Sequence, residues 1–368
     1  MRFLAFFVIF TGIIGLAHFY VGRRLVSASG LSLARRRLGW MLVVLSFVLT
    51  ASPMIMQIFL RGRFSSTAIA WVGFVAMGFF SVLAVLTIGR DLIYVLVRGA
   101  GIIARLATKL FASKPQSPVL IDADRRKVLI AGSNFAVLGL SGALTGVGVF
   151  EARRQPRVLP VEVPIPNLPP QFDGFKIVQI SDLHVGPTIK RDWIEMVART
   201  ADNAGADLVV FTGDLVDGSV PQLREDTAPL ADLSARYGRF FVTGNHDYYS
   251  GVMPWLDEIT RLGWDCLLNT HRVIEKNGGR IVVAGVTDFN AAGYFADQAS
   301  NPQAAIAGAP DGAVRILLAH QPKSVDAALA AGYDLQLSGH THGGQFFPWD
   351  NLARLAQPYL SGLHRHEK

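Results

Sequence analysis

Four long apolar stretches occupy the first 150 residues, and they constrain the fold of this chain more than any other feature. They cover residues 3–21, 39–60, 67–88 and 128–150, the last being weaker and richer in Gly, Ser and Asn. A helix needs about 20 apolar residues to cross a hydrocarbon core of ~30 Å. Four such stretches flanked by arginines are hard to bury in a soluble protein, so we predict a transmembrane domain of about four helices over residues 1–150.

Two of the stretches also resemble export signals. The first is too long for the apolar region of a typical signal peptide, and no A-x-A cleavage site follows it. The fourth follows Arg125, Arg126 and Lys127 and is similar to a twin-arginine signal, but it lies inside the chain. We therefore interpret both stretches as retained spanning helices.

The distribution of Lys and Arg predicts the topology. The loops after the first and third stretches are far more basic than the loop after the second, which holds only Arg61 and Arg63. Basic loops stay in the cytoplasm, so both termini should lie outside, although Arg153, Arg154 and Arg157 argue weakly against this. We predict a multi-pass protein of the cell (inner) membrane whose C-terminal domain, residues 151–368, is extracytoplasmic.

The third loop has a pattern of its own. Between residues 98 and 114, basic side chains alternate with apolar ones. The spacing fits a short amphipathic helix on an anionic leaflet, and it fits a solvated charged helix equally well.

The composition of the chain excludes several kinds of site and ligand for the second half. Cys266 is the single cysteine, which excludes a disulfide framework and a cysteine-based zinc site. The net charge of +7 arises in the membrane half, whereas residues 171–368 carry more Asp and Glu than Lys and Arg. Because nucleic-acid recognition needs a basic soluble face, we expect no nucleic acid binding.

Beyond a proline-rich junction at residues 156–170, short apolar segments run repeatedly into polar clusters. The segments expected to be strands cover residues 175–180, 207–211, 239–242, 315–319 and 335–337, and helical patterns fall between several of them, such as 191–203 and 324–331. This alternation predicts a sheet whose strand ends build a site at one edge. Within the junction, Val161, Val163 and Ile165 alternate as in an edge strand, where proline is tolerated.

The polar side chains at the strand ends are carboxylates, imidazoles and one amide. They are Asp182, His184, Asp214, Asn245, His246, His320, His340 and His342. This mixture suits divalent ions such as Mn, Fe or Zn. Residues two apart on an extended segment face the same way, so Asp182 and His184 can hold one ion together. One such pair is unspecific, but five clusters at strand ends indicate a metal centre.

The order D-x-H, G-D, G-N-H-D, H and G-H-x-H resembles the signature of calcineurin-like metallophosphoesterases over residues 182–345. Residues 172–178 and the sequence Gly343-Gly344-Gln345 are similar to the bacterial membrane-linked branch of that family. Some members of this branch carry a membrane anchor, and others resemble lipid pyrophosphatases. The resemblance implies an α/β (α+β) metallophosphoesterase sandwich, with two mixed β-sheets flanked by helices.

The resemblance also implies a role for each residue. A first metal ion would be bound by Asp182, His184, Asp214 and His342, and a second by Asp214, Asn245, His320 and His340. Asp214 would bridge the two. His246 would act as general acid or transition-state stabiliser, and Asp217 would orient it. The implied cofactors are two divalent metal ions, Mn, Fe or Zn.

These roles predict a membrane-anchored phosphoesterase that hydrolyses a phosphodiester, phosphomonoester or pyrophosphate bond by metal-hydroxide attack. The substrate is a phosphorylated small molecule or lipid, and the stiff proline-rich junction favours one in or near the bilayer. The alternative is a non-enzymatic membrane scaffold, but scaffold versions lose ligands that this chain keeps. Family members continue through further strands after G-H-x-H, whereas this chain ends at Lys368, so we expect a shortened sandwich or an incomplete chain.

Overall fold

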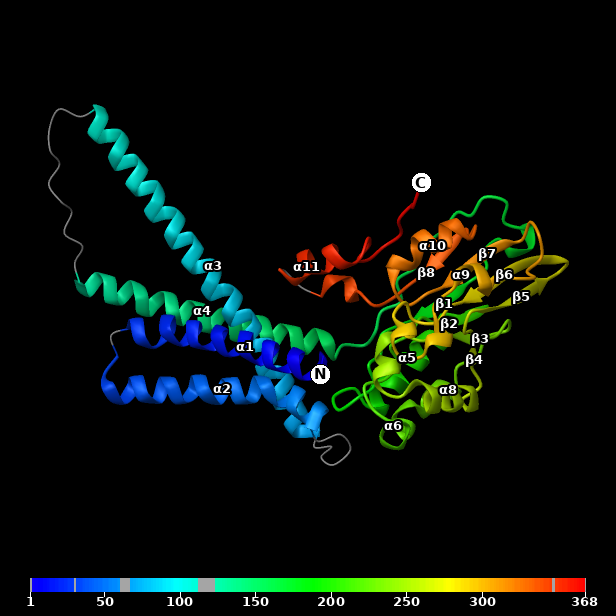
Figure 1. The fold of residues 1–368 in the computed structure, drawn as a ribbon, viewed down its shortest axis with the longest axis horizontal. Coiled ribbons are helices and arrows are strands. Elements are labelled where there is room, and N and C mark those ends of the chain that lie inside the picture. Colours follow the sequence, from blue (N-terminus) through cyan, green and yellow to red (C-terminus); the bar gives the residue numbers. More distant parts are fainter. Residues whose placement is uncertain (1, 30, 60–66, 112–122, 346–347, 368) are drawn as a thin grey trace. The chain divides into compact units, whose positions relative to one another are not determined.

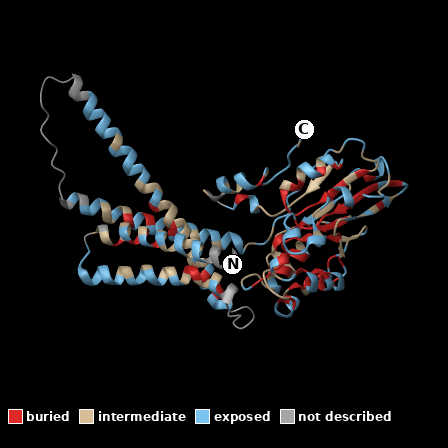
Figure 2. Ribbon diagram, viewed as in Figure 1, coloured by how far each residue is buried: buried red, intermediate tan, exposed pale blue. Residues whose placement is uncertain are grey.

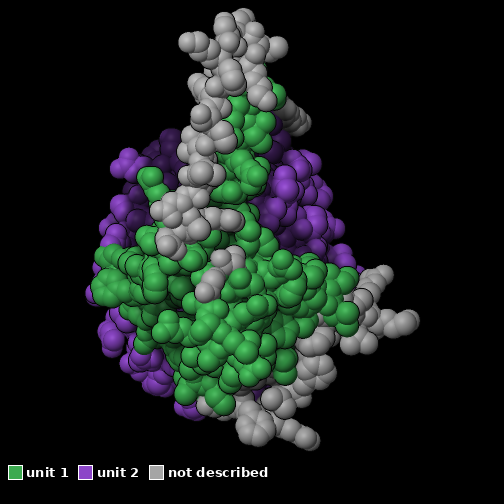
Figure 3. Space-filling view, turned by 90° about the vertical axis from the view of Figure 1, so that its left-hand side faces the viewer, with its two compact units in different colours: residues 1–154 green, residues 155–368 purple. Residues whose placement is uncertain are grey.

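The computed structural model describes residues 2–29, 31–59, 67–111, 123–345 and 348–367. The chain forms two compact units, Met1–Arg154 and Gln155–Lys368, which Figure 3 colours green and purple. Unit 1 consists of long helices, and unit 2 contains all the strands of the described chain (Figure 1).

Unit 1 is built from four helices. They are α1 (Arg2–Leu25), α2 (Leu33–Phe59), α3 (Thr67–Phe111) and α4 (Ala123–Ala152). Three described stretches are long and apolar enough to cross a membrane: Leu33–Ile55, Thr67–Ala107 and Lys127–Ala152. Within the most apolar part of each stretch, only 11% to 22% of the residues are buried. Most of these helices are therefore exposed (Figure 2).

Helix α3 corrects one prediction. The sequence placed a loop after residue 88 and a separate short helix at 98–114, but one continuous helix of 45 residues runs to Phe111. Its length is about 67 Å at 1.5 Å per residue, roughly twice the thickness of a hydrocarbon core. Arg90, which the sequence placed in that loop, lies inside the helix next to Asp91, and both side chains pair with residues of other helices. Arg61, Arg63 and Lys114 lie outside the described residues.

A polar cluster joins three helices of unit 1. The carboxylate of Asp91 on α3 accepts hydrogen bonds from Tyr20 and Arg24 on α1. The neighbouring Arg90 donates to Asn134 Oδ1 on α4 over 2.6 Å. Since polar groups within apolar helices need internal partners, this cluster stabilises the association of α1, α3 and α4.

Unit 2 contains two four-stranded sheets. The first is wholly parallel, in the order β1 (Ile177–Ile180), β2 (Leu208–Phe211), β3 (Arg239–Phe241), β4 (Asp265–Cys266). The second is mixed, in the order β5 (Thr270–Lys276), β6 (Gly279–Gly285), β7 (Val314–Leu318), β8 (Leu335–Leu337), with only the β5–β6 pair antiparallel. The sequence predicted two mixed sheets, so the parallel first sheet is a detail it did not reveal.

The sheets pack face to face between two layers of helices. One face of β2 contributes Leu208 and Val210 to the core between the sheets, and the other face contributes Val209 and Phe211 to the core under the helices. All four side chains are buried, as expected for a strand covered on both sides. The first sheet is covered by α5 (Arg191–Asn203), α6 (Val220–Thr227) and α8 (Val252–Arg261), and the second by α9 (Pro302–Ala305) and α10 (Val325–Ala330).

Two further helices lie near the strand ends. The short α7 (Asn245–Tyr249) begins directly after β3, and α11 (Trp349–Ala356) follows the loop after β8. The edge strand predicted for the junction was wrong, because residues 156–165 form no regular structure. The junction is held instead by Ile165 and Leu168, which pack on the core between the sheets.

Candidate metal centre

The loops after five strands carry the predicted site residues. Asp182 and His184 follow β1, Asp214 and Asp217 follow β2, and Asn245 and His246 open α7 after β3. In the second sheet, His320 follows β7, and His340 and His342 follow β8. Parallel strands end at the same edge of a sheet, so residues up to 160 positions apart in the sequence meet there.

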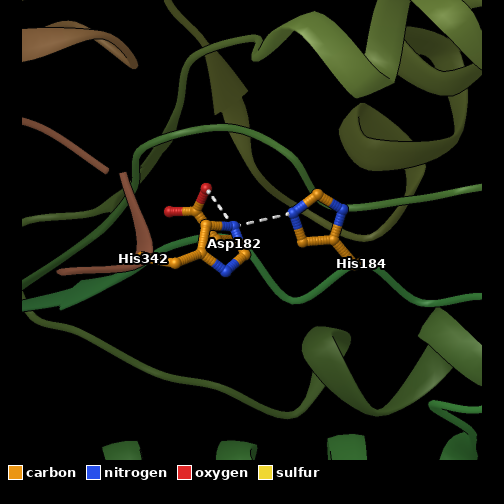
Figure 4. Close-up of side chains that lie close together, drawn as sticks. All are labelled: Asp182, His184 and His342. Carbon is orange, nitrogen blue, oxygen red and sulfur yellow. Dashed lines mark hydrogen bonds and ion pairs between the residues drawn. The ribbon is translucent and has the colours of Figure 1, made fainter. Parts of the chain in front are cut away.

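Two groups of donor atoms form within this edge. Asp182, His184 and His342 form one, with donor atoms that all lie within 4.8 Å of one another (Figure 4). In this group His342 Nε2 lies 3.4 Å from Asp182 Oδ1 and 3.1 Å from His184 Nε2. Asp214, His320 and His340 form the other group within the same limit.

Asp214 connects the two groups. Its Oδ2 atom lies 3.1 Å from His320 Nε2 and 3.7 Å from His184 Nε2. The side chain is almost completely buried, so the carboxylate cannot turn away into water. One carboxylate thus faces imidazoles of both groups, which is the position that a bridging ligand requires.

The backbone is strained at these residues. Asp182, His184, Asp214, His340 and His342 all have positive φ, between 47° and 74°. Non-glycine residues seldom adopt this left-handed conformation, and it concentrates at functional sites. The sharp turns direct side chains from separate strand ends into one space.

Two glycines of the motifs allow loops after different strands to lie close together. A Cβ atom at Gly244 would lie 2.2 Å from Asp214 Oδ1, and one at Gly339 would lie 2.2 Å from Asp182 Oδ2. The backbone and side chain of Asp214 leave no room for a Cβ atom at Gly244, and a Cβ atom at Gly339 would displace the side chains of Ser181 and Asp182. The G of G-N-H-D and the G of G-H-x-H are therefore explained by close packing.

The donor set fits divalent cations. Asn245 is nearly buried, and its Oδ1 atom has no hydrogen-bond partner among the described residues. His340 Nδ1 faces His320 Nε2 at 3.2 Å, so two ring nitrogens converge on the same region. An orphaned amide oxygen and converging imidazole nitrogens are costly without a ligand, and a divalent cation would satisfy them.

The electrostatics keep the carboxylates ionised. Burial alone would raise the pKa of Asp182, but hydrogen bonding with His342 and the charge of His320 lower it to about 2. Burial would likewise raise the pKa of Asp214, and the contact with His320 lowers it. Burial would lower the pKa of His320, but Asp214 and Asp182 raise it to about 9. The carboxylates of Asp182 and Asp214 therefore stay ionised inside the protein, where they can attract cations.

His246 lies beside the two groups and is held by Asp217. Its Nδ1 atom lies 2.5 Å from Asp217 Oδ1, while its ring remains about one-third exposed. Burial would lower the pKa of His246, but Asp217 raises it above its usual value. A partly exposed imidazole with one nitrogen fixed and a raised pKa is suited to donate a proton.

Asp217 has a second contact that the sequence did not reveal. Its other oxygen, Oδ2, lies 3.1 Å from Nδ1 of His184. The three residues form a further candidate metal group by distance. Each imidazole turns its Nδ1 to the carboxylate, however, and this leaves the Nε2 atom of His184 facing the first group. Asp217 therefore orients a predicted metal ligand as well as His246.

Sequence reasoning also missed Asp247, the last residue of G-N-H-D. Its fully buried carboxylate accepts hydrogen bonds from the backbone N–H groups of Gly244, Asp214 and Leu215, at 2.8 to 3.1 Å. Burial, together with the charge of Asp214, raises its pKa to about 7. Asp247 binds the loop after β2 to the loop after β3, so it positions Asp214 against Asn245. Only its place in the motif could have indicated this.

The fold and the donor set define a class, the metal-dependent phosphoester hydrolases built on a two-sheet sandwich. Residues 175–344 match the family model described as calcineurin-like phosphoesterase. A transmembrane protein with metallophosphoesterase domain from Danio rerio is 33% identical over 272 residues, which cover 72% of this chain and 61% of that protein. Its counterpart from Bos taurus is 37% identical over 252 residues, covering 66% and 56%.

A bacterial relative is also similar. An uncharacterized metallophosphoesterase from Aquifex aeolicus is 36% identical over 182 residues, which cover 48% of this chain and 67% of that protein. The chain belongs to the calcineurin-like phosphoesterase family, and this confirms the resemblance and the sandwich fold inferred from the sequence. It spans 56% to 61% of the length of the two vertebrate relatives.

Proposed function

We propose that this chain is a membrane-anchored hydrolase that uses two divalent metal ions, Mn, Fe or Zn, to cleave a phosphoester or pyrophosphate bond. The observation that carries the proposal is the position of Asp214, between His320 of one donor group and His184 of the other. A single buried carboxylate that faces two sets of donors supports a pair of ions more than one isolated ion. Asp182, His184, Asp214 and His342 would hold the first ion, and Asp214, Asn245, His320 and His340 the second.

Metal ions at such a site lower the pKa of water and polarise phosphoryl oxygens. The remaining work falls to side chains of the protein. His246 donates a proton to the leaving oxygen, and Asp217 holds the imidazole in the orientation that this transfer requires. Asp247 keeps the loops after β2 and β3 together, so the donor atoms stay in place during the reaction.

We also propose that residues 1–150 form the membrane domain and residues 151–368 the catalytic domain, on the extracytoplasmic side of the cell membrane. The distribution of basic loops supports this orientation. The apolar helices and the transmembrane relatives support the anchor itself. A junction rich in proline supports a catalytic domain that stays near the bilayer, where it meets a lipid-linked substrate.

Metal analysis together with turnover tests the proposal. The full chain, purified in lipid nanodiscs, should bind two divalent ions and hydrolyse bis(4-nitrophenyl) phosphate, and a chelator should abolish this activity. Asp214→Ala should lose both ions and the activity together. Ser234→Ala is the matched control, because the Ser234 hydroxyl donates to Asp202, which is not a predicted site residue. Full activity of a metal-free Asp214→Ala preparation would contradict the mechanism.

A further inference from the structure

An open pocket of about 260 Å³ adjoins the donor groups on the side of the second sheet. Its polar end is formed by His340 and His342, with Thr341 between them. Its far wall belongs to α11, through Ala353, Ala356 and the following Gln357. The pocket therefore leads from two predicted metal ligands to a helix that has no part in the metal centre.

Helix α11 is amphipathic, and its apolar face is only partly used. Asp350, Asn351 and Arg354 share one side of the helix. Ala353 and Ala356 line the pocket, while Leu352 and Leu355 are 56% and 84% exposed. Residues three apart lie next to each other on a helix, so the two leucines form one apolar surface. This surface continues the apolar wall of the pocket outward.

Hydrogen bonds connect α11 to the loops that carry the predicted metal ligands. The side chain of Gln357, directly after α11, is buried, accepts a hydrogen bond from the Lys323 backbone and donates one to Gln321 Oε1. Gln321 in turn donates to the buried carboxylate of Asp288 over 2.7 Å. On the other side, Thr341 donates to the carbonyl oxygen of Leu360. The pocket wall is therefore fixed against the loops that carry His320, His340 and His342.

The chemistry of the lining indicates what the pocket binds. A phosphoryl group belongs at the histidine end, where the cations would lie. The wall opposite is formed by Ala353, Ala356 and Gln357, and the described lining residues include no Lys, Arg, Asp or Glu. A group bound there gains by leaving water, and it forms no charge pair with the wall.

We propose that this pocket binds the hydrocarbon part of an amphiphilic phosphoester substrate, with Ala353 and Ala356 leaving the space for it. The proposal rests on the proposed phosphoester hydrolysis and specifies its substrate class. Leu352 and Leu355 receive the part of the alkyl chain that emerges from the pocket. Each buried methylene contributes roughly a fourfold gain in binding, so a few methylenes distinguish such a substrate from a small phosphoester.

Two 4-nitrophenyl phosphodiesters that differ only in the second alcohol, methyl or hexyl, test the proposal on the full chain in nanodiscs with Mn. The kcat/KM value for the hexyl ester should exceed that for the methyl ester at least tenfold. Ala353→Leu and Ala356→Leu fill the pocket and should remove this preference. Ala327→Leu, on an exposed position of α10, is the matched control and should keep the preference.

A milder variant protects the test against misfolding. Leu355→Ser alters a side chain that is 84% exposed, so it should fold normally and lower the hexyl preference about two- to threefold. Calorimetric titration with hexylphosphonate and methylphosphonate measures the same selectivity without turnover. Equal turnover of both esters by the unmodified chain, or a preference that survives Ala353→Leu and Ala356→Leu, would overturn the pocket assignment and leave the hydrolase proposal standing. If neither ester is hydrolysed while hexylphosphonate still binds more tightly, the hydrolase proposal fails and the pocket remains.

Discussion

The two units of this chain place polar and apolar side chains in opposite ways. In unit 1, Leu16 and Phe135 are 70% and 76% exposed, whereas His18 is buried among the helices. In unit 2, Phe211 is 1% exposed and lies under the helices of the first sheet. Phenylalanine thus lies on the outside of one unit and in the core of the other. The difference indicates two solvents, lipid for unit 1 and water for unit 2.

Both units nevertheless bury polar groups, and they satisfy them differently. In unit 1, Thr87 and Ser141 donate to backbone carbonyls four residues earlier, and Asp91 pairs with Arg24. In unit 2, the buried Asn245 oxygen has no partner in the described part of the chain, and imidazoles converge on Asp214. Polar groups that satisfy one another stabilise a bundle, whereas polar groups that point at a common space form a binding site.

Topology reporters have the largest expected effect, because each reporter fusion should be either fully active or inactive. A reporter that is active only outside the cytoplasm should be active when it is fused after unit 2. The same reporter should be inactive when it is inserted between α3 and α4, since the basic loops should face the cytoplasm. The reverse pattern would mean that the membrane domain has the opposite orientation, and an inactive reporter at both positions would mean that α4 does not span the membrane.

Removal of the proposed proton donor, His246, should have the next largest effect. His246→Ala should lower kcat by about 10²–10⁴-fold, a typical contribution of a proton-transfer residue. Both metal ions should remain bound, because the ring is held by Asp217 and is not one of the predicted ligands. Turnover and metal content are measured on the same sample. Loss of an ion in His246→Ala would instead make His246 a ligand in the group with His184 and Asp217.

Alanine substitution of one phenylalanine in each unit tests whether lipid surrounds unit 1 and a packed core surrounds the residue in unit 2. Phe211→Ala should destabilise unit 2 by about 3–5 kcal/mol, because it leaves a cavity in a packed core. Phe135→Ala should change the stability of unit 1 in lipid by less than about 1 kcal/mol, because lipid replaces the lost contacts. Thermal or denaturant unfolding in nanodiscs measures both. Equal losses at the two positions would mean that α4 is covered by protein rather than by lipid.

Much of the site could be predicted because its residues follow apolar strands. The strands can be predicted from their hydrophobicity. The end of such a strand lies within three residues of Asp182, Asp214 and His320 in each case. Helix α5 also has the predicted limits, since its amphipathic pattern is strong. Local patterns of this kind are sufficient to place residues at one sheet edge.

Other features depend on contacts between distant residues. The second contact of Asp217, with His184, joins two loops, and no spacing within either loop indicates it. The length of α3 was missed because Arg90 was counted in a basic loop, and its partner Asn134 on α4 is known only from the folded chain. The pocket beside α11 was missed for the same reason, since His342 and Ala356 meet only in the folded chain.

The left-handed residues of the metal centre affect how much of this protein a cell can maintain. Such a conformation costs about 1–2 kcal/mol per non-glycine residue, so five positions cost about 5–10 kcal/mol, similar to the total stability of a domain. Bound metal offsets part of this cost, because it binds only the folded form. We therefore expect the metal-free domain to melt at a lower temperature and to be degraded faster, which thermal unfolding and limited proteolysis with and without chelator can measure. Metal supply would then set the abundance of this protein as well as the activity proposed for it.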